Sequence, residues 1–553
     1  MAEPRSNQGP EDDRENLAAG FATVLFDALP RILSQLDRDP DSPTFGCFDR
    51  NYWHYKIRDF PSAILQQAML VLDALSRYEH GVNLLQERPV VGKWIDGAMR
   101  FWAGQQLRSG AFNEYYPYEE GYPPTAFSLN AVTLVFRNRE FPTPEGPVRA
   151  ATQRACDWLL EHPEREALNQ EAAGLAALAN AARIPDVHVD QARLDERLDT
   201  LLAAQSPEGW FPEYGGADLG YLSVTIDCLC DLFELTEDEK LLEAIGRAVE
   251  FLAAMVTVSH ETPVMANSRN TDYVVPYGLV RAAEHDARAA AIVRQLYRGV
   301  SRPDHFLRRT DDRYCCHYVY SSCFRALPCL ERMTAPASLP CQEGGDRFFR
   351  EAGVFVRHQP GEASVFVAGR KGGVVSVFAP EGLHAADYGW RRRARGKMAV
   401  SHWQDPSYEV EEAATGKDVC VTVRGRMTAH RWLTPTPFRH FVLRVLSRLF
   451  GRALIPWLKE AMIFRHPATG PEFERRVLIA EDGVRIEDTF FGRHTDLERA
   501  PKYSLRHVSS AGQFTRDELT PPTQEGPAVP CAGQRVQAVR TLALGHGARQ
   551  PEQ

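Results

Sequence analysis

The chain has 553 residues, which is too many for one ordinary domain and suggests about two to four domains. Hydrophobic residues make up 44% and charged residues 25%, as is typical of globular proteins. The net charge of −9 argues against nucleic acid as a partner of the whole chain, and no apolar run approaches the roughly 20 residues of a membrane span.

The N-terminal stretch "MAEPRSNQGPEDDRENL" is polar and acidic. It lacks the basic and apolar regions of a secretory signal, so we expect a cytoplasmic protein. The 11 cysteines include no CxxC pair. Buried thiols are therefore a simpler interpretation than a metal or redox site.

Six segments begin with small or polar residues and continue with apolar residues on nearly all sides, as buried helices do. They recur at intervals of roughly 50 residues and start near Asp59, Pro123, Asn169, Tyr221, Asn270 and Val319. Amphipathic helices with a charged face alternate with them, for example from Val148, Gln191 and Asp238. This alternation predicts an N-terminal (α/α)6 toroid over residues 1–338, with the buried helices as its inner ring and all outer-to-inner loops at one mouth.

Two of these loops repeat one aromatic, acidic pattern. The stretch "QLRSGAFNEYYPYEEGY" from Gln106 matches "QSPEGWFPEYGGADLGY" from Gln205 at seven positions, and Glu119 falls on Asp218. We expect the shared Gln-x-x-x-Gly-x-Phe element to be structural, because glycine permits the turn and phenylalanine fills the space between helices. The acidic and aromatic positions need another reason.

A Pro/Gly-rich linker follows residue 335, and short alternating runs then begin near residues 353, 364, 373, 418, 475 and 484. These runs predict antiparallel strands. The fold class is therefore α+β multidomain, with the toroid followed by an antiparallel β-sandwich over residues 345–553.

Residues 437–465 interrupt the β pattern with a basic amphipathic segment. Arg444, Arg448 and Arg452 are four residues apart and share one helical face, and Trp457 follows an interruption at Pro456. One interpretation is an interfacial segment that holds the protein at the inner membrane surface. The other is a helix packed on the toroid, with its arginines paired to acidic residues.

The loops at the predicted mouth are rich in aromatic, amide and carboxylate side chains. Aromatic rings stack on sugar faces, and polar or cationic groups bind hydroxyls and uronates, so we expect an oligo- or polysaccharide partner. The candidate substrate-binding residues are Trp53, His54, Glu114, Tyr115, Glu119, Tyr122, Gln170, Tyr214, Arg269, Asn270 and Tyr273. Asn169 and Asn270 also occupy positions typical of helix N-caps.

The order of these motifs resembles the heparinase II/III-like polysaccharide lyases and their alginate-lyase relatives. The resemblance rests on "LNQEAA" at the start of one inner helix and "EGWFPEYGGADLGYL" before the next. It implies a toroid and a β-sandwich with the active site between them. It also implies Asn169 as the group that neutralises a uronate carboxylate and Tyr221 as the catalytic tyrosine. The family's two histidines are replaced by Gln170 and Leu222, and a glutamine cannot take a proton at neutral pH.

The chemistry that follows is β-elimination at a uronic acid. Asn169 and Arg269 would neutralise the carboxylate, and Tyr221 would remove the C5 proton if nearby cations lowered its pKa; His317 is the replacement base. C5-epimerisation shares the first step. Glu213 and Asp218, with Glu114 and Glu119, could instead serve a glycoside hydrolase, and the missing histidines would also fit a non-catalytic glycan-binding protein.

No cofactor is expected. A structural zinc in the β-domain is a weaker alternative, because the spacing of His384, Asp387, His402 and Asp405 fits no strong zinc motif.

Overall fold

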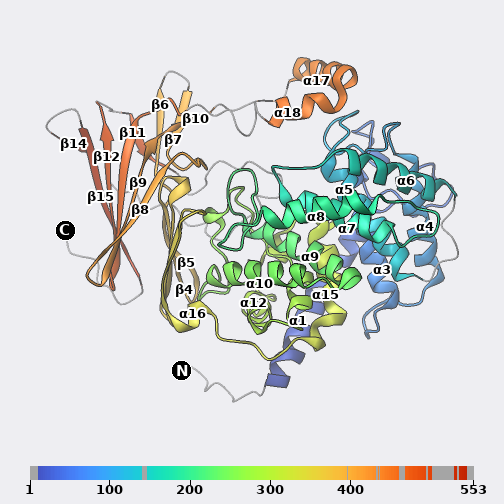
Figure 1. Ribbon diagram of the computed structural model, residues 1–553, viewed down its shortest axis with the longest axis horizontal. Coiled ribbons are helices and arrows are strands. Elements are labelled where there is room, and N and C mark those ends of the chain that lie inside the picture. The colour runs from blue at the N-terminus through green and yellow to red at the C-terminus, as the bar shows by residue number, and fades with distance from the viewer. Residues whose placement is uncertain are drawn as a thin grey trace.

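Figure 1 shows the computed structural model of the chain, with a helical domain on one side and a β-domain on the other. The structure describes residues 10–139, 146–394, 397–430, 434, 436–459, 468–492, 496–500, 529–531 and 535–544.

Among these residues, six helices form the inner ring of the helical domain. They are α3 (Met69–Arg77), α5 (Tyr122–Asn138), α7 (Leu168–Ala181), α9 (Leu219–Thr236), α11 (Tyr277–Ala282) and α15 (Tyr318–Ala326). Each contacts the next in this order, and α15 contacts α3, so the ring closes. In α7 every residue is buried, as in a helix that is apolar or small on all sides.

Each inner helix packs against at least one outer helix, and α7 and α11 each pack against two. The outer helices are α1 (Pro10–Gln35), α4 (Pro89–Gly104), α6 (Gly146–Glu161), α8 (Gln191–Ala203), α10 (Glu239–Ala254) and α12 (Ala287–Tyr297). The predicted fold class, an (α/α)6 toroid followed by a β-domain, is confirmed.

The predicted starts of the inner helices agree with the structure to within two residues in four of six cases. The first inner helix begins as a 3-10 turn, η1 (Ala63–Ala68), before α3. The prediction near Asn270 was wrong by seven residues, because α11 begins only at Tyr277. Asn270 lies in a loop with a left-handed backbone (φ 56°) and caps no helix. Asn169 is the second residue of α7 and not its cap, which is Ala167.

Helix α1 corrects the expectation that no run approaches the length of a membrane span. By length and composition alone, its residues Asn16–Gln35 could cross a membrane. The helix packs against α12, α15, α14 (Asp312–Cys315) and η3 (Leu327–Arg332), with Phe21, Leu25 and Ile32 buried. Packing of this kind is also found in the core helices of globular proteins.

The Gln-x-x-x-Gly-x-Phe element of the repeated loop has a structural role. Gly110 has φ +98°, and a Cβ there would clash with the carbonyl of Arg154 on the next outer helix. Gln106 Nε2 donates to the carbonyl oxygens of Gly110 (2.9 Å) and Ala151 (2.7 Å), while Phe112 is fully buried. The second copy repeats these contacts with Gln205, Gly209, Ala244, Arg247 and Phe211. The prediction that this element is structural is confirmed.

In the described residues, the β-domain consists of three antiparallel sheets. A five-stranded sheet contains β1 (Gly345–Phe349), β2 (Val354–Gln359), β3 (Ala363–Ala368), β4 (Val374–Ala379) and β5 (Gly382–Asp387), in that order. A six-stranded sheet has the order β14 (Val529–Cys531), β15 (Arg535–Ala543), β12 (Gly483–Phe491), β11 (Glu472–Ile479), β9 (Asp418–Arg426) and β8 (Glu409–Thr415). The four-stranded sheet has the order β10 (Thr428–His430), β7 (Lys397–Val400), β6 (Trp390–Ala394) and β13 (Leu497–Arg499). All six predicted strands are present.

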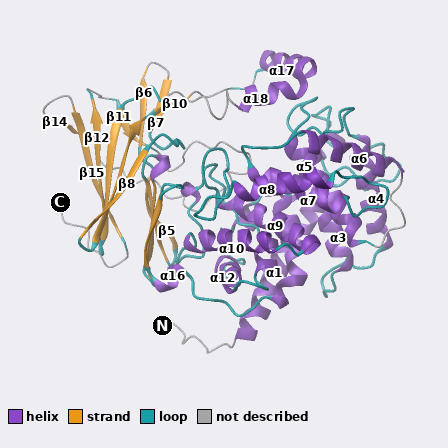
Figure 2. Ribbon diagram, in the orientation of Figure 1, coloured by secondary structure: helices purple, strands orange, loops and turns teal. Residues whose placement is uncertain are grey.

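The five-stranded sheet lies between the helices and the six-stranded sheet (Figure 2). Phe355, Val365 and Val377 share a core with the six-stranded sheet, whereas Val356 and Phe366 join the core of the toroid. Both faces are buried, so β3 and β4 are apolar at nearly every position.

The contact between the domains runs along the end of α10. Phe251 packs edge-on against Phe349 with ring centroids 5.0 Å apart, and His358 Nε2 lies 3.0 Å from the carbonyl oxygen of Ala254. The backbone N–H of Val258 donates to Ser364 Oγ. This interface is partly apolar, so the toroid needs the sheet to cover it.

A fragment that ends near Ser338 is therefore expected to be helical by circular dichroism but poorly soluble. Removal of the sheet exposes the apolar surface around Phe251. Size-exclusion chromatography and activity measurements check this expectation. A stable monomeric fragment with full activity would contradict an active site shared by the two domains.

Candidate active site

The loops that lead from outer to inner helices meet at one mouth of the toroid and, together with one turn of the β-domain, supply a cluster of polar and aromatic side chains. We call it the mouth cluster: Asn169, Gln170, Glu213, Tyr214, Asp218, Tyr221, Arg269, Asn270, Tyr273, His317, Tyr318 and Lys371.

Asp218 ties two of these loops together. It is the N-cap of α9, and its carboxylate accepts from the backbone N–H of Tyr221 (3.2 Å) and of Arg269 (3.0 Å). The hydroxyl of Thr271 donates to it as well. Burial nevertheless raises the pKa of Asp218 above its ordinary value. With its oxygens bound in this way, Asp218 holds the loop of Arg269 against the start of α9.

Glu213 and Asn169 form a second buried pair. The backbone N–H and the side-chain Nδ2 of Asn169 donate to the Glu213 carboxylate at 2.6 and 2.7 Å. Burial raises the pKa of Glu213 well above its usual range. The helix dipole of α7 points its positive end at the same carboxylate. Since the amide of asparagine carries two N–H donors, one remains after the bond to Glu213.

A cation lies over an aromatic ring beside this pair. The guanidinium carbon of Arg269 is 4.7 Å from the centroid of the Tyr214 ring, and Tyr214 OH accepts from Gln170 Nε2 at 3.0 Å. Arg269 is only 4% exposed, and burial lowers its pKa, although an arginine remains charged at neutral pH. A positive charge in so little water interacts strongly with an anion.

Tyr221 lies in the first turn of α9 and is buried. Burial, and then the neighbouring tyrosines Tyr318 and Tyr214, raise its pKa well above 10. In this state the phenol is protonated at neutral pH, so the lowered pKa that a base would need is not present. The hydroxyls of Tyr273 and Tyr318 lie 2.5 Å apart next to it.

His317 precedes α15 and packs between Tyr314 and Tyr318, with ring centroids 4.9 and 4.7 Å away. Both ring nitrogens are buried and have no hydrogen-bond partner in the described part of the chain. Burial, assisted by the charge of Arg313, lowers the pKa of His317 well below 6.5. The lowered pKa keeps the imidazole neutral, with a lone pair that can accept a proton, but makes it a weaker base than a histidine in water.

Lys371 is the member that sequence reasoning missed. It belongs to the β-domain, in the turn η4 (Gly369–Lys371) between β3 and β4, and is 2% exposed. Its Nζ donates to Asn270 Oδ1. Burial lowers its pKa to about 7; the charge of Asp218 opposes this shift and that of Arg269 adds to it. The two glycines after it in "RKGGVV", both with positive φ, were the available signal for a tight turn.

The matching loop of the first repeat forms the rim of the mouth. Arg313 Nη2 pairs with Glu114 Oε1 at 2.7 Å, and its guanidinium lies over the Tyr115 ring at 5.0 Å. Glu119 accepts from the backbone N–H groups of Glu114 and Tyr115, both at 2.8 Å. Burial and the neighbouring Glu114 raise the pKa of Glu119 to about 7.

Three predicted site residues have other contacts. Trp53 donates its indole N–H to the carbonyl of Gln35 at the end of α1 (2.7 Å), and His54 packs on Trp53. Tyr122, the repeat counterpart of Tyr221, donates to Glu171 Oε2 (2.7 Å). It also accepts from Arg197 Nη2 (3.0 Å). These contacts hold Trp53 and Tyr122 within the scaffold around the mouth, whereas His54 is exposed.

Asp387, one of the four residues of the alternative zinc site, is bound by arginines. Asp387 pairs with Arg475 (2.8 Å), Arg499 (2.6 Å) and Arg540 (3.1 Å), and these cations hold its pKa at about 2 although burial opposes them. Among the described residues, no group of three or more His, Cys, Asp or Glu side chains could hold a metal ion.

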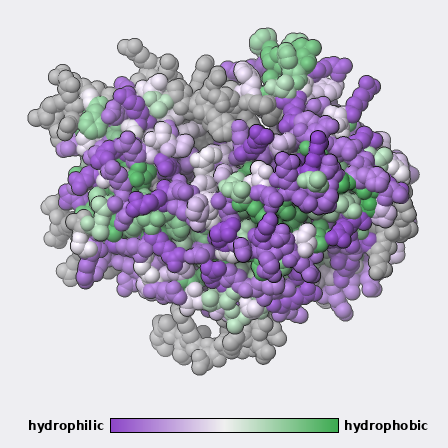
Figure 3. All heavy atoms as spheres, in the orientation of Figure 1, coloured by the Kyte–Doolittle hydropathy of each residue, from purple (hydrophilic) through white to green (hydrophobic). Residues whose placement is uncertain are grey.

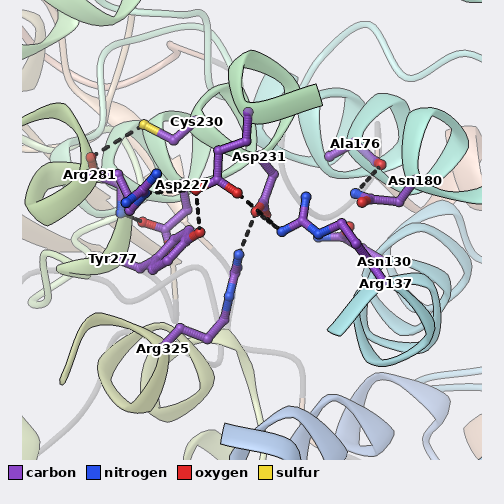
Figure 4. Close-up of polar contacts among 12 residues, drawn as sticks. Asn130, Arg137, Ala176, Asn180, Asp227, Cys230, Asp231, Tyr277, Arg281 and Arg325 are labelled. Atoms are coloured by element: carbon purple, nitrogen blue, oxygen red, sulfur yellow. Dashed lines mark hydrogen bonds and ion pairs between the residues drawn. The ribbon is translucent and has the colours of Figure 1, made fainter. Parts of the chain in front are cut away.

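A second polar network lies at the other end of the inner ring (Figure 4). Asp231 on α9 pairs with Arg325 on α15 at 2.5 Å and with Arg137 on α5 at 3.4 Å. Arg325 in turn lies 3.6 Å from the ring centroid of Tyr277 on α11. The network links four inner helices and contains none of the predicted site residues.

No family model matches the chain, and no curated protein matches it. Solved structures do. Chondroitin AC lyase of Streptomyces coelicolor A3, in complex with chondroitin sulphate, aligns over 89% of this chain and 68% of its own, with 12% identity and a TM-score of 0.50. The fold is that of a polysaccharide lyase.

Two other lyase structures align over similar spans. Heparinase III covers 89% of this chain and 74% of its own, with 11% identity and a TM-score of 0.47. Heparan sulfate lyase HepC from Pedobacter heparinus covers 90% and 72%, with 10% identity and a TM-score of 0.38. The predicted resemblance to lyases is confirmed for the fold, by the S. coelicolor structure; at these identities this lyase fold carries no residue roles over to the chain.

Proposed function

We propose that the protein is a polysaccharide lyase that cleaves a uronic-acid-containing glycan by C5 proton abstraction and β-elimination. The observation that carries the proposal is the composition of the mouth cluster. Two buried cations, Arg269 and Lys371, lie in one cluster with a protonated phenol, Tyr221, and a neutral imidazole, His317. These are the groups that an elimination next to a carboxylate requires.

The carboxylate of the uronate is the anion that the two cations would bind. Its neutralisation makes the C5 proton more acidic, because negative charge that develops at C5 spreads onto the carboxyl group. Arg269 and the remaining N–H of Asn169 donate to the carboxylate. An anion beside Lys371 also raises the pKa of that lysine and keeps it protonated.

The two neutral groups, His317 and Tyr221, then transfer the protons. His317 accepts the C5 proton on a ring nitrogen. The electron pair of the broken C5–H bond forms the C4–C5 double bond, and the bond from C4 to the glycosidic oxygen breaks. Tyr221 donates its phenolic proton to that oxygen. A protonated tyrosine suits this second step, and its raised pKa supports the assignment.

The titration of Lys371 is expected to make kcat/KM depend on pH. Because its pKa in the free protein is about 7, its positive charge is lost as the pH rises above 7. The value of kcat/KM, which reports the free enzyme, is therefore expected to fall above pH 7, while kcat changes little. Lys371→Arg should extend the plateau by at least two pH units, because arginine stays charged. An unchanged alkaline limb in Lys371→Arg would remove Lys371 from the binding of the carboxylate.

Product analysis tests the proposed reaction. Incubation with a panel of uronate polysaccharides is expected to yield oligosaccharides with a C4–C5 double bond, detected by ultraviolet absorbance and mass spectrometry. The second candidate is hydrolysis, favoured by the pKa of about 7 at Glu119, which would suit a general acid. New reducing ends without unsaturation would establish hydrolysis and reject the lyase. Inverted C5 centres without cleavage would indicate an epimerase, and binding without turnover would indicate a glycan-binding protein.

A further inference from the structure

The repeated loop places a second stack of tyrosine and arginine outside the mouth cluster. Tyr115 in the first copy of the loop occupies the position of Tyr214 in the second copy. In each copy an arginine from another loop lies over the ring, Arg269 over Tyr214 at 4.7 Å and Arg313 over Tyr115 at 5.0 Å. Arg269 is only 4% exposed, whereas Tyr115 is 46% exposed. The second copy therefore places this pair of groups inside the mouth, and the first copy presents the same pair to solvent at the rim.

The rim borders the mouth cluster on the side of His317. Arg313 lies in α14, and the ring of the next residue, Tyr314, packs on His317 with centroids 4.9 Å apart. Burial and the charge of Arg313 together lower the pKa of His317. A glycan chain that leaves the mouth on this side therefore passes Tyr115.

The basic segment that interrupts the β pattern extends the rim (Figure 1). It folds as α17 (Pro437–Phe450) and α18 (Leu454–Lys459), joined by a short turn at Gly451, which has positive φ. The interruption does not lie at Pro456 as predicted, because Pro456 falls inside α18. The predicted residues 460–465 lie outside the described residues.

The arginines of α17 face the rim. Arg444 pairs with Asp59 at 2.6 Å, and Arg448 donates to Tyr118 OH at 2.8 Å. The apolar side of α17, with Phe441 65% exposed, points away from the toroid, and Figure 3 shows it as a hydrophobic patch. The contacts agree with the interpretation of a helix packed on the toroid through its arginines. The interpretation of an interfacial membrane segment stays a prediction.

Tyr118 and Arg448 form a further stack of this kind on the rim. The guanidinium carbon of Arg448 is 5.1 Å from the centroid of the Tyr118 ring, and Tyr118 is 43% exposed. Tyr118 follows Tyr115 in the same loop and has a φ of 63°, which bulky residues rarely adopt. Backbone strain that a fold retains at such a position is typical of functional sites.

Arg448 has donors to spare for a ligand. Arginine carries five N–H donors, and Tyr118 OH accepts only one of them. The carboxylates of the rim have partners within the protein: Glu114 and Asp59 each pair with another arginine, and Glu119 accepts backbone N–H groups of its own loop. In the part of the chain that the structure describes, no carboxylate pairs with Arg448, whose side chain is exposed.

An exposed aromatic ring beside an arginine suits an acidic sugar. The C–H face of a sugar ring packs on an aromatic face, and a guanidinium binds a carboxylate with two parallel N–H···O bonds. We propose that Tyr115, Tyr118 and Arg448 form a distal subsite, which binds a second acidic sugar of the glycan whose scissile bond lies in the mouth. The distal subsite rests on the proposed function, because it takes the substrate to be a chain with more than one acidic sugar.

Electrophoresis through gels that contain a uronate polymer tests the distal subsite by binding alone. Full-length wild type is expected to be retarded by at least one of alginate, polygalacturonate and chondroitin sulphate. The double variant Tyr118→Gly, Arg448→Ala should need at least tenfold more of that polymer for the same retardation. The control Leu84→Ala, Arg426→Ala removes an exposed apolar side chain (76%) and a half-exposed arginine (56%) outside the rim and should migrate like wild type.

Equal retardation of the two double variants would overturn the distal subsite, as would a wild type that none of the three polymers retards. Unfolding is not expected to confuse the result. Glycine is unstrained at the φ of 63° found at Tyr118, and Arg448 is exposed, so both double variants should keep the circular dichroism of wild type.

The length of the substrate separates the distal subsite from the mouth. On the polymer, Tyr118→Gly, Arg448→Ala should raise KM at least tenfold with kcat within about twofold, because contacts that are equal in ground state and transition state change KM alone. On the shortest oligosaccharide that is cleaved, the rise in KM should be at least fivefold smaller, since such a chain ends before the rim. Equal rises on both substrates would contradict the distal subsite.

Failure of the proposed reaction gives a different result. In that case no polymer yields unsaturated products, but the rim variant still loses its retardation and the control does not. Unsaturated products together with unchanged retardation of the rim variant would leave the reaction in place and reject the distal subsite.

Discussion

Tyr221→Phe is expected to lower turnover at least about 100-fold while the fold stays intact, because the variant lacks the proton that the leaving oxygen requires. The aromatic ring is retained, so the packing at the start of α9 is preserved. Initial rates of double-bond formation measure the effect, and circular dichroism verifies the fold.

The repeated loop offers a matched control. Tyr122 occupies the equivalent position in the first copy, but its hydroxyl is bound by Glu171 and Arg197. Tyr122→Phe should therefore change turnover by less than about fivefold and lower stability by about 1–3 kcal/mol, since it leaves a buried carboxylate short of a partner. Wild-type turnover of Tyr221→Phe on a true substrate would remove the mouth cluster from the reaction.

Asp231→Ala is expected to destabilise the protein by about 3–5 kcal/mol. The change removes the buried Asp231 carboxylate from Arg325, whose side chain is 12% exposed, and loss of the partner of a largely buried charge is costly, whereas Arg137 keeps its ion pair with Glu234. Denaturant unfolding, followed by the signal of the helices, measures the loss.

An exposed ion pair supplies the control for this result. Lys240 and Asp199 lie 3.3 Å apart and are about two-thirds exposed, so Asp199→Ala should change stability by less than about 1 kcal/mol. Equal effects of the two substitutions would show that the network in Figure 4 does not hold the inner helices together.

The inner ring could be predicted from the sequence because buried helices leave a strong signal. Their residues are apolar or small on every side, and the spacing recurs six times. The start of α11 could not be predicted in this way. The residues before Tyr277 form an irregular loop whose path depends on Asp218 and Asn267, and side chains from distant loops leave no periodic pattern.

The candidate active site, too, could be predicted from the sequence only in part. Loop composition was enough to gather Asn169, Glu213 and Tyr221, but Lys371 lies in a turn of the other domain and reaches the mouth only through tertiary packing. Tyr122 and Tyr221 have equivalent sequence positions and different surroundings, which the sequence alone does not distinguish. The amphipathic pattern of α17 was visible too, but not which of its faces the toroid would cover.

The central claim is that the mouth cluster acts on a sugar carboxylate, and one comparison tests it most directly. A uronate polysaccharide that is a substrate, and the same polymer with its carboxylates reduced to alcohols, are incubated with the wild-type protein. The account predicts unsaturated products from the first polymer and none from the second, because without the carboxylate Arg269 and Lys371 cannot make the C5 proton acidic. Cleavage of both polymers at similar rates would contradict it.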